Sequence, residues 1–567
     1  MRCERVWNDR LAISNTLYEE ELKMTREKSL IKILFGTFLI LLLLESPFGG
    51  NHIISAAPPV KELIYAAPGL PVSLDVDGRV TLHYPSLCVT GNLYDPLLDY
   101  KTKPDGEGNM VPVIERGMPV MEGKLAESWE ISPDGLTITF RLRKGVKSNY
   151  GYELTAQDVA DTFKRQYKNP GSLDIFIFKM AGITTEDHIK VIDRYTLQIK
   201  KDYFTTYERC QLGQGQANIA DMTEFKKHYT KDDPVAVDWA LKNWAGHGPY
   251  IITKWVAGQE LVLEARPDYW RGEPKIKRVT IKEVPESATR MALLARGAVD
   301  IAEGLTPRQI EELRGKPGIR IAEVWGIHYA QLSQNFKSPP FDNPKVRQAI
   351  AYAIPYEAVI KDVFYGKGRY TKSILLLVFG LERNSPYRYD LDKAKALLTE
   401  AGHAKGFQTT LSYNIEEPAA EEICVLIRDS LKKIGVDVVL DKMPPAKFAG
   451  LRIRRQLPNM FVSTTSRVVS PSAELGMYVL SPGGVMNYAG MPPHPEVDKI
   501  LKGVLPKTKD LKERTKLLNE VQDIIAWEYL TFTPICEYKY QLAMKDDIVG
   551  YTYRTDSVIR FDLLDKK

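Results

Sequence analysis

Alternating apolar and polar residues predict several strands in the first half of the chain. In residues 136–143, Leu, Ile, Phe and Leu alternate with Thr, Thr, Arg and Arg, which is the two-residue period of a half-buried strand. The Ser-Pro-Asp-Gly sequence at 132–135 has the composition of a turn, so we expect a hairpin here. A second hairpin is predicted in 248–270, with its turn at 257–259, and KRVTIKEV at 277–284 predicts a further strand.

The helical period follows directly after the first hairpin. In LTAQDVADTFKRQY, Val159, Phe163 and Tyr167 lie on one face of the predicted helix. Thr155 can cap this helix, and Asp158 places a negative charge in its first turn, where it suits the helix dipole. A later helix is expected at about 287–296, followed by a short strand that begins at 299–301.

Beyond about residue 326 the pattern changes to alternating helices and strands. The clearest unit is a strand at 408–414, a helix at 419–435 and a strand at 436–442. The helix has an apolar face made of Ile423, Leu426, Ile427, Leu431 and Ile434. This order predicts a right-handed crossover in a partly parallel sheet. Because no low-complexity linker interrupts the chain, we expect it to pass between domains through ordered strands, as a hinged protein requires.

Length and composition indicate a globular protein of several domains. A chain of 567 residues exceeds what one core holds, and its 44% hydrophobic and 26% charged residues exclude a disordered or fibrous protein. The net charge of +5 is small for this length. It gives no support for a nucleic-acid partner, which would need basic residues gathered on one face.

The N-terminus has the layout of a secretory signal. The apolar run at 33–44 is shorter than the ~20 residues of a membrane-spanning helix. Three basic residues precede this run, and Ser-Ala-Ala at 55–57 follows it. We therefore expect residues 1–57 to be a signal peptide, with Met24 as an alternative start, and a mature periplasmic protein that begins near Pro58. An uncleaved membrane anchor is the alternative. No cysteine lies just after the apolar run, so no lipid-anchoring site is expected.

The sequence lacks the common catalytic and cofactor motifs. It has no HExxH, no His/Cys cluster, no phosphate-binding P-loop and no Gly-x-Ser-x-Gly nucleophile elbow. We therefore expect no enzymatic activity, no metal and no cofactor. The cysteines left after signal cleavage are far apart, and we expect buried thiols, with at most two disulfides as the alternative. These are Cys88, Cys210, Cys424 and Cys536.

Four segments, in order, resemble the bacterial extracellular solute-binding proteins of family 5, which include peptide-, dipeptide- and nickel-binding proteins. The first is LAESWEISPDGLTITFRLRKGV with LTAQDV, and the second is GHGPYIITKWVAGQELVLEARPDYW. The third is PPFDNPKVRQAIAYAI, and the fourth is YRYDLDKAKALLTEAG. His247, in the second segment, stands where the family usually has a small hydroxyl residue. The resemblance covers most of the chain from about Val60 onward.

This resemblance implies an α/β fold of the type II periplasmic-binding-protein kind, with two hinged α/β lobes and an additional inserted domain. By analogy, lobe I comprises 58–105, 245–325 and 530–567, the extra domain comprises 106–244, and lobe II comprises 326–529. The implied function is that of a monomeric receptor of an ABC importer, which captures a peptide or peptide-like solute and delivers it to a membrane permease. Closure of the lobes is then a population shift driven by contacts that ligand makes in the closed state.

One position departs from the family in a way that bears on the ligand. Peptide binders of the family typically carry an acidic residue in a lobe II loop, which pairs with the amino terminus of the peptide. The matching stretch, MFVSTTSRVVSPSAEL, places Arg467 at that position, and no carboxylate occurs between Met460 and Ala473. An arginine offers a planar fork of donors to a carboxylate or phosphate, so the hypothesis is an anionic ligand. In the alternative, Arg467 pairs with a protein carboxylate or points to solvent.

Other cleft candidates rest on position in the family pattern. HYPSLCVTGNLYDPLL resembles an early loop that lines the cleft, two residues lie near the expected first crossing between lobes, and two lie in a segment that resembles a later cleft-side loop. For each aromatic residue among them, packing in the core remains the alternative. The candidates are Tyr84 and Cys88, Trp325 and His328, and Asn487 and Tyr488.

Two further functions compete with transport. A sensor or chaperone on the same scaffold would pass its ligand or a conformational signal to a partner other than a permease. A secreted peptide hydrolase is the remaining alternative, because a catalytic site can be assembled from scattered residues.

Overall fold

The computed structural model describes residues 61–567 except 78–82, 116–117, 170–171, 173, 207–211, 213–216, 371–384, 465–476, 478–479, 483, 485–486, 531 and 557. From residue 60 onward the chain forms one compact unit. The predicted signal peptide at 1–57, Arg467 and Cys210 lie outside the described residues. No helix in the described part of the chain is long and apolar enough to cross a bilayer.

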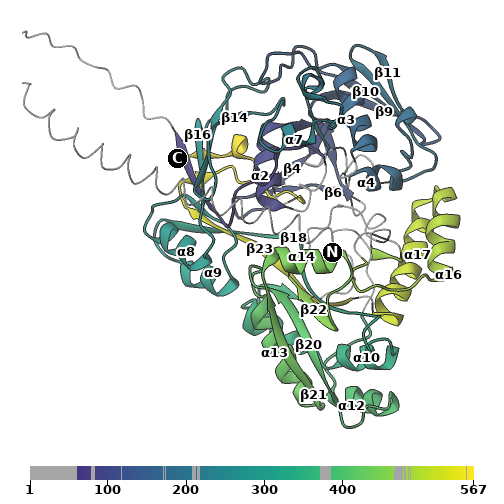
Figure 1. The fold of residues 1–567 in the computed structure, drawn as a ribbon. Coiled ribbons are helices and arrows are strands. Elements are labelled where there is room, and N and C mark those ends of the chain that lie inside the picture. Colours follow the sequence, from purple (N-terminus) through teal and green to yellow (C-terminus); the bar gives the residue numbers. More distant parts are fainter. Residues whose placement is uncertain are drawn as a thin grey trace, which may run out of the picture. The chain divides into compact units, whose positions relative to one another are not determined.

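A single large sheet runs through the described structure and includes strands from both halves of the chain (Figure 1). Its main path has the order β14-β15-β16-β1-β17-β23-β18-β22-β20-β21. The short strand β19 lies off this path and pairs with β23. The strands are β1 (Glu62–Ala67), β14 (Tyr250–Val256), β15 (Glu260–Ala265), β16 (Arg278–Glu283), β17 (Ile301–Ala302), β18 (Ile319–Gln334), β19 (Gly368–Arg369), β20 (Phe407–Asn414), β21 (Val436–Met443), β22 (Met460–Ser463) and β23 (Thr533–Lys545).

The first half of this sheet, β14 to β17, is covered on both faces. Strands β1, β16 and β17 are parallel, and β14 and β15 form the predicted hairpin. On one face α8 (Ser287–Ala295) and α9 (Pro307–Leu313) enclose a small apolar cluster. On the other face α2 (Tyr84–Leu93) and the chain after Ile548 share a larger core with the strands.

The second half of the sheet contains the predicted strand–helix–strand unit. β20 and β21 are parallel, and α13 (Ala420–Lys432) connects them and lies along them (Figure 1). Its apolar face packs into a core with α10 (Pro344–Tyr352) and α12 (Leu391–Glu400). The predicted order of strand, helix and parallel strand is confirmed. It could be predicted because the amphipathic period of the helix is local and regular.

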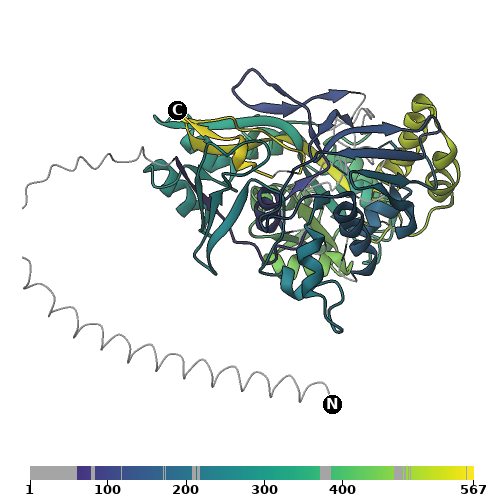
Figure 2. The ribbon, with the colours of Figure 1, turned by 90° about the horizontal axis from the view of Figure 1, so that it is seen from above.

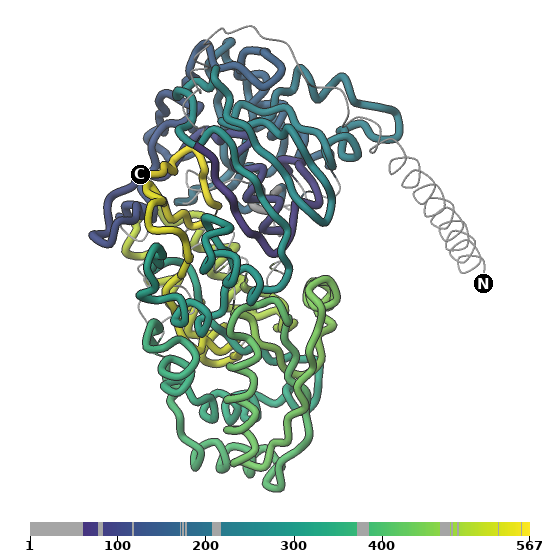
Figure 3. The backbone as a smooth tube through the Cα atoms, turned by 90° about the vertical axis from the view of Figure 1, so that its left-hand side faces the viewer, coloured from purple at the N-terminus to yellow at the C-terminus, as the bar shows by residue number. Residues whose placement is uncertain are grey.

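Two long strands, β18 and β23, belong to both halves. They are antiparallel, with Ile319 opposite Lys545 at one end and Leu332 opposite Thr533 at the other. β23 pairs with β17 in the first half, and β18 pairs with β22 in the second. In Figure 3 the teal and yellow tubes of these strands run between the purple-to-teal part and the green part of the chain. The expected passage through ordered strands is therefore observed.

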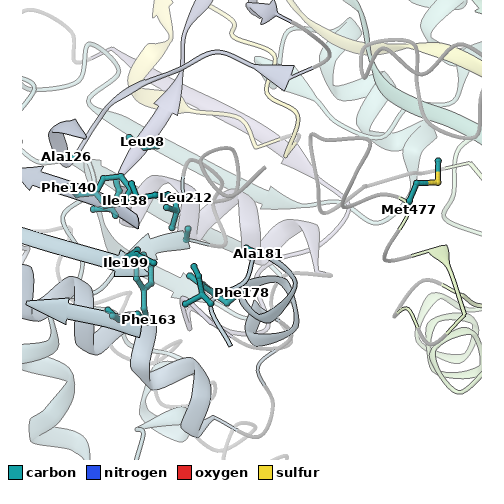
Figure 4. Packing of buried hydrophobic residues seen from close by; sticks show 14 of the residues in the cluster. Leu98, Ala126, Ile138, Phe140, Phe163, Phe178, Ala181, Ile199, Leu212 and Met477 are labelled. Carbon is teal, nitrogen blue, oxygen red and sulfur yellow. The ribbon is translucent and has the colours of Figure 1, made fainter. Parts of the chain in front are cut away.

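A separate four-stranded antiparallel sheet, of order β11-β12-β10-β9, is formed by residues 126–200. The predicted hairpin joins β9 (Ala126–Ile131) to β10 (Thr137–Leu142), and β11 (Ile189–Asp193) and β12 (Thr196–Lys200) complete the sheet. Side chains of β10 and β12 face α3 (Ala156–Lys168) and α4 (Asp174–Met180) in Figure 4. Thr155 caps α3 as its sequence predicted, and the Asp158 side chain accepts in turn from the Thr155 amide, which completes a capping box.

Short elements complete the described structure. In Figures 1 and 2, α16 (Pro495–Asp498) and α17 (Leu511–Gln522) lie beside the blue strands of the four-stranded sheet. The remaining helices and strands are β2 (Asp95–Pro96), β3 (Leu98–Tyr100), β4 (Thr102–Pro104), β5 (Met110–Pro112), β6 (Ile114–Glu115), β7 (Met118–Pro119), β8 (Met121–Gly123), β13 (Asn218–Ile219), α6 (Met222–Phe225), α7 (Val237–Ala240), α11 (Tyr356–Ala358), α14 (Pro445–Ile453), β24 (Ile548–Val549) and β25 (Asp565–Lys566). The side chains of Cys88, Cys424 and Cys536 are buried.

Candidate functional site

The pairing of the two long strands is interrupted where the halves of the sheet meet. Trp325 lies opposite Lys539 and Tyr329 lies opposite Glu537, so residues 326–328 of β18 face only residue 538 of β23. Such a bulge bends a strand and increases its twist. This interruption is the point at which β18 leaves the first half of the sheet and enters the second.

A tyrosine from the C-terminal segment fits against this bulge. The hydroxyl of Tyr553 accepts a hydrogen bond from the Ile327 amide at 3.0 Å. A Cβ atom on Gly326 would lie 2.1 Å from that hydroxyl, so only glycine leaves room for the buried ring. The Tyr553 side chain therefore requires glycine at position 326, and its hydroxyl holds the backbone amide of Ile327.

A pocket of about 250 Å³ lies along the edge of β18 beside the bulge. Within the described residues, β22 pairs with β18 only from Gln331 onward, which leaves the earlier edge of β18 open. The pocket combines an apolar wall with carboxylates and one ammonium, a composition suited to an amphipathic solute. It is lined by Asp105, Glu107, Val111, Pro112, Ile114, Glu323, Val324, Trp325, Gly326, Ile327, Lys539, Tyr553 and Thr555.

Both candidates near the predicted first crossing lie at this point. Trp325 lines the pocket and is 38% exposed, an unusual exposure for the largest apolar side chain. His328 is buried, and its ring stacks on Tyr540 with 4.8 Å between centroids. Tyr538 and Tyr553 also lie against His328. The bulge is therefore surrounded by aromatic rings from three segments of the chain.

Tyr84 and Cys88 lie in helix α2 and not in the loop that the sequence predicted. Both are buried in the core of the first half of the sheet, and Tyr540 packs against the same core. Burial raises the pKa of Tyr84 well above its usual range, and the Glu303 carboxylate adds to the shift. Tyr540, on which the His328 ring stacks, therefore packs against the core that holds Tyr84 and Cys88.

Asn487 and Tyr488 lie elsewhere, beside the end of β22. The Asn487 side chain exchanges two hydrogen bonds of 2.9 Å with the backbone of Met491, which hold its own loop together. The Tyr488 ring lies 4.8 Å from the Arg452 guanidinium carbon, and Arg452 donates to the Ser463 hydroxyl at 3.4 Å. The candidate residues in the described structure therefore form two groups, one at the bulge and in the first half of the sheet and one beside the second half.

Sequence reasoning missed a carboxylate that holds the end of β22. Glu417 accepts a hydrogen bond of 2.7 Å from the Thr464 amide and one of 3.2 Å from the Ser463 hydroxyl. The Tyr538 hydroxyl donates to the Thr464 carbonyl, which ties this end to the strand crossing. The sequence held a signal for this residue, because Glu417 follows the carboxyl end of β20. β20 is parallel to β22, and ligands bind at the carboxyl edge of such parallel strands.

No group of three or more His, Cys, Asp or Glu side chains in the described residues is arranged to hold a metal ion. The site described above consists of an aromatic cluster at a bent strand crossing, an adjacent pocket and a hydrogen-bonded strand end. Such an arrangement can bind a small amphipathic molecule and change shape around it.

Comparison with known proteins places this geometry in a family. Residues 120–486 match the family model described as bacterial extracellular solute-binding proteins, family 5 middle. A probable D,D-dipeptide-binding periplasmic protein of Escherichia coli K12 is 27% identical over 529 residues, covering 92% of this chain and 96% of the relative. A glutathione-binding protein of Salmonella choleraesuis is 28% identical over 463 residues, covering 78% of this chain and 86% of the relative.

A solved structure gives the same result for the fold. The ABC transporter-associated periplasmic binding protein DppA of Helicobacter pylori, in complex with the peptide STSA, aligns with a TM-score of 0.74 at 26% identity. The alignment covers 89% of this chain and 98% of that chain. The predicted fold class, a type II periplasmic-binding-protein fold of mixed α/β content, is confirmed.

Proposed function

Because the chain belongs to the bacterial extracellular solute-binding proteins of family 5, we propose that it is the substrate-binding component of an ABC importer, capturing a peptide or peptide-like solute. The observation that carries this proposal is the match to the dipeptide-binding relative over nearly the full length of both chains. The peptide-bound structure from Helicobacter pylori supports the ligand class. Members of this family are binding proteins, and we propose that this chain has no catalytic turnover.

The proposal places the chain in the periplasm, exported by the signal peptide at 1–57 and delivering its solute to a membrane permease as a monomer. Its two lobes correspond to the two halves of the large sheet, and residues 106–244 form the additional domain. The hinge comprises the bulge at 326–328 and Tyr538 opposite it. We propose that the second crossing lies at Tyr538 rather than at residue 530, because residues 533–537 pair with the part of β18 beyond the bulge.

Purified protein is expected to bind a peptide with one-to-one stoichiometry and to become more compact. Native mass spectrometry of protein isolated from its own host identifies a carried solute, and titration calorimetry with di- and tripeptides gives the affinity. Small-angle scattering with and without the bound peptide then measures closure. Hydrolysis of the peptide that survives purification and is lost on a single substitution would contradict the transport function.

We further propose that Arg467 binds a negative group of the solute, since it stands where related peptide binders carry an acidic residue and no carboxylate occurs between Met460 and Ala473. A charge-assisted hydrogen bond contributes about 1.5–3 kcal/mol, so Arg467→Ala is expected to weaken binding of an acidic peptide about ten- to a hundredfold. Arg467→Lys recovers part of the loss, because an ammonium lacks the two-pronged geometry. Calorimetry on the three proteins measures this, with Arg428→Ala, an exposed arginine of α13, as the control. Equal affinities for all variants would exclude the role.

A further inference from the structure

A short segment of lobe II lies against the hinge on the edge of β23 away from β18. β19 pairs with β23, Gly368 opposite Tyr538 and Arg369 opposite Glu537. The amide of Lys539 also donates to the carbonyl of Lys367 at 3.0 Å. Residues 367–369 are therefore fixed by their backbone to the strand that crosses between the lobes.

The side chain of Arg369 contacts both sides of the bulge. Its Nε donates to the Glu537 carboxylate at 2.7 Å, and Glu537 is only 2% exposed. Its guanidinium carbon also lies 4.3 Å from the centre of the Trp325 ring. Glu537 pairs with the lobe II part of β18, whereas Trp325 is the last paired residue before the bulge on the lobe I side. One guanidinium therefore joins the two lobes.

Glu323 forms a second connection of the same kind. This buried carboxylate accepts hydrogen bonds from Arg314, which follows α9 in lobe I, and from Gln541 at 2.7 Å. The ammonium of Lys367 lies 3.8 Å away, across the hinge. Burial alone would raise the pKa of Glu323, but the hydrogen bonds from Gln541 and Arg314 outweigh it and lower the pKa. Glu323 therefore stays charged at neutral pH and attracts Lys367.

We propose that residues 367–369 form a latch across the hinge, which stabilises the conformation described here and so sets the open–closed equilibrium of the ligand-free protein. The proposal rests on the proposed hinge. Arg369 contacts one residue on each side of the bulge, so rotation at 326–328 changes at least one of its two distances. A ligand that binds only one lobe arrangement then binds with an affinity scaled by the population of that arrangement. Arg369 and Lys367 are positioning residues and need not touch the solute.

The direct test is to measure the distance between two spin labels, one on each lobe, in ligand-free protein. Spin labels at Gln259→Cys, beside β15, and Asp437→Cys, in β21, lie near opposite ends of the sheet, and the described native cysteines are buried. A Cys210→Ser background removes a further thiol. The labels are expected to report two distances, one for the described conformation and one for the other arrangement of the lobes. A cation–π contact of this type changes an equilibrium about three- to tenfold. Arg369→Ala is therefore expected to reduce the population of the described conformation, relative to the other, by that factor.

The matched control is Arg388→Ala. Arg388 lies 4.1 Å from the Tyr370 ring and donates to carbonyls of Ser385 and Tyr387, so it makes the same type of contact within lobe II. Its removal is expected to leave the distance distribution unchanged. Wild-type protein in 1 M salt is expected to move in the direction of Arg369→Ala, because the Lys367 contact is screened at that ionic strength.

Two conservative variants separate positioning from simple stability. Arg369→Lys keeps the charge but loses the fork, and Trp325→Phe keeps a ring, so each is expected to give an intermediate distance ratio. If Arg369→Ala and wild type give the same distribution, the latch is excluded, whatever the melting temperature does. All measurements use ligand-free protein, so failure to find a peptide ligand would count against the proposed function and not against the latch.

Discussion

Arg560→Met is expected to lower the free energy of unfolding by about 3–5 kcal/mol, because it removes one counter-charge from two buried carboxylates. Arg560 is 4% exposed, and its guanidinium donates to Asp562 at 2.8 Å and to Asp95 at 3.2 Å. Asp95 is completely buried, and it also accepts hydrogen bonds from Tyr269 and Trp270. Its carboxylate thus joins the C-terminal segment to strand β2.

Arg560 is one member of a larger buried network. The Lys124 ammonium lies 3.0 Å from Asp95 and 3.1 Å from Asp99, and Asp99 also pairs with Arg554. Burial would raise the pKa of Asp99, but the charges of Arg554 and Lys124 outweigh it and hold the pKa well below its usual range. Removal of one partner from such a network destabilises the fold by more than the net contribution of the intact pair, since the remaining charge stays buried and desolvated.

Urea denaturation measures the effect, with Arg308→Met as the control. Arg308 pairs with Glu312 at 3.2 Å on the surface of α9, and the side chains are 75% and 46% exposed, so a change below about 1 kcal/mol is expected. A change in Arg560→Met as small as that of the control would show that the buried network relaxes at no cost.

The pH dependence of the same variant follows from Asp562. Burial raises the pKa of this carboxyl, and Arg560 reverses the shift and lowers it in the native protein. A lowered carboxyl pKa stabilises the fold above the unfolded pKa of about 4, and this stabilisation is lost as the pH falls through the folded value. The difference in stability between wild type and Arg560→Met is therefore expected to be full at pH 7 and to shrink below about pH 4.

Gly326→Ala is expected to destabilise the protein by about 1–3 kcal/mol, the usual cost of overpacking, and to disturb the hinge. The added Cβ would lie 2.1 Å from the Tyr553 hydroxyl and 2.3 Å from Cζ. Tyr553 is buried and its hydroxyl accepts a hydrogen bond from the Ile327 amide. Relief of the clash requires a displacement of β18 at the bulge or of the Tyr553 ring, and either movement strains or breaks this hydrogen bond. Weaker closure around ligand is the functional consequence, measured by scattering.

Gly503→Ala is the control, because a Cβ atom there meets nothing within 4 Å. A double-mutant cycle with Tyr553→Ala isolates the clash. Tyr553→Ala alone removes a buried ring at a cost of about 3–5 kcal/mol, and the double variant is expected to lose about 1–3 kcal/mol less than the sum. Additive losses would show that the ring of Tyr553 is not what requires glycine at this position.

Local elements of the fold could be predicted where one face of a segment meets a core and the other meets water. The Thr155 cap of α3 and the hairpin at the N-terminal side of this helix were predicted because their signals lie within a few residues of each other. Helix α2 was missed for the opposite reason. Nine of its ten residues are buried, so no polar face repeats every 3.6 residues, and the segment was interpreted as a loop.

The candidate site shows the same division between local and long-range information. Trp325 and His328 were placed near the first crossing by motif order alone, and the structure puts both at the strand bulge. The partners that give this place its properties come from distant parts of the chain. Tyr553 reaches Ile327 across 226 residues, and Arg369 reaches Glu537 across 168. No periodicity or spacing connects residues so far apart.

The sequence by itself determined the family, the fold class and the strand–helix–strand unit of β20, α13 and β21, because each depends on patterns within one short segment or on the order of such segments. Only the tertiary structure decided where β18 bends, which residues lie opposite each other where the two halves of the sheet meet and which charges are buried together. The registers of β18 and β23, and the joining of Arg560 to Asp95, are settled by simultaneous packing of segments that the chain brings together only on folding. Long-range pairing of this kind has no local signature in the sequence.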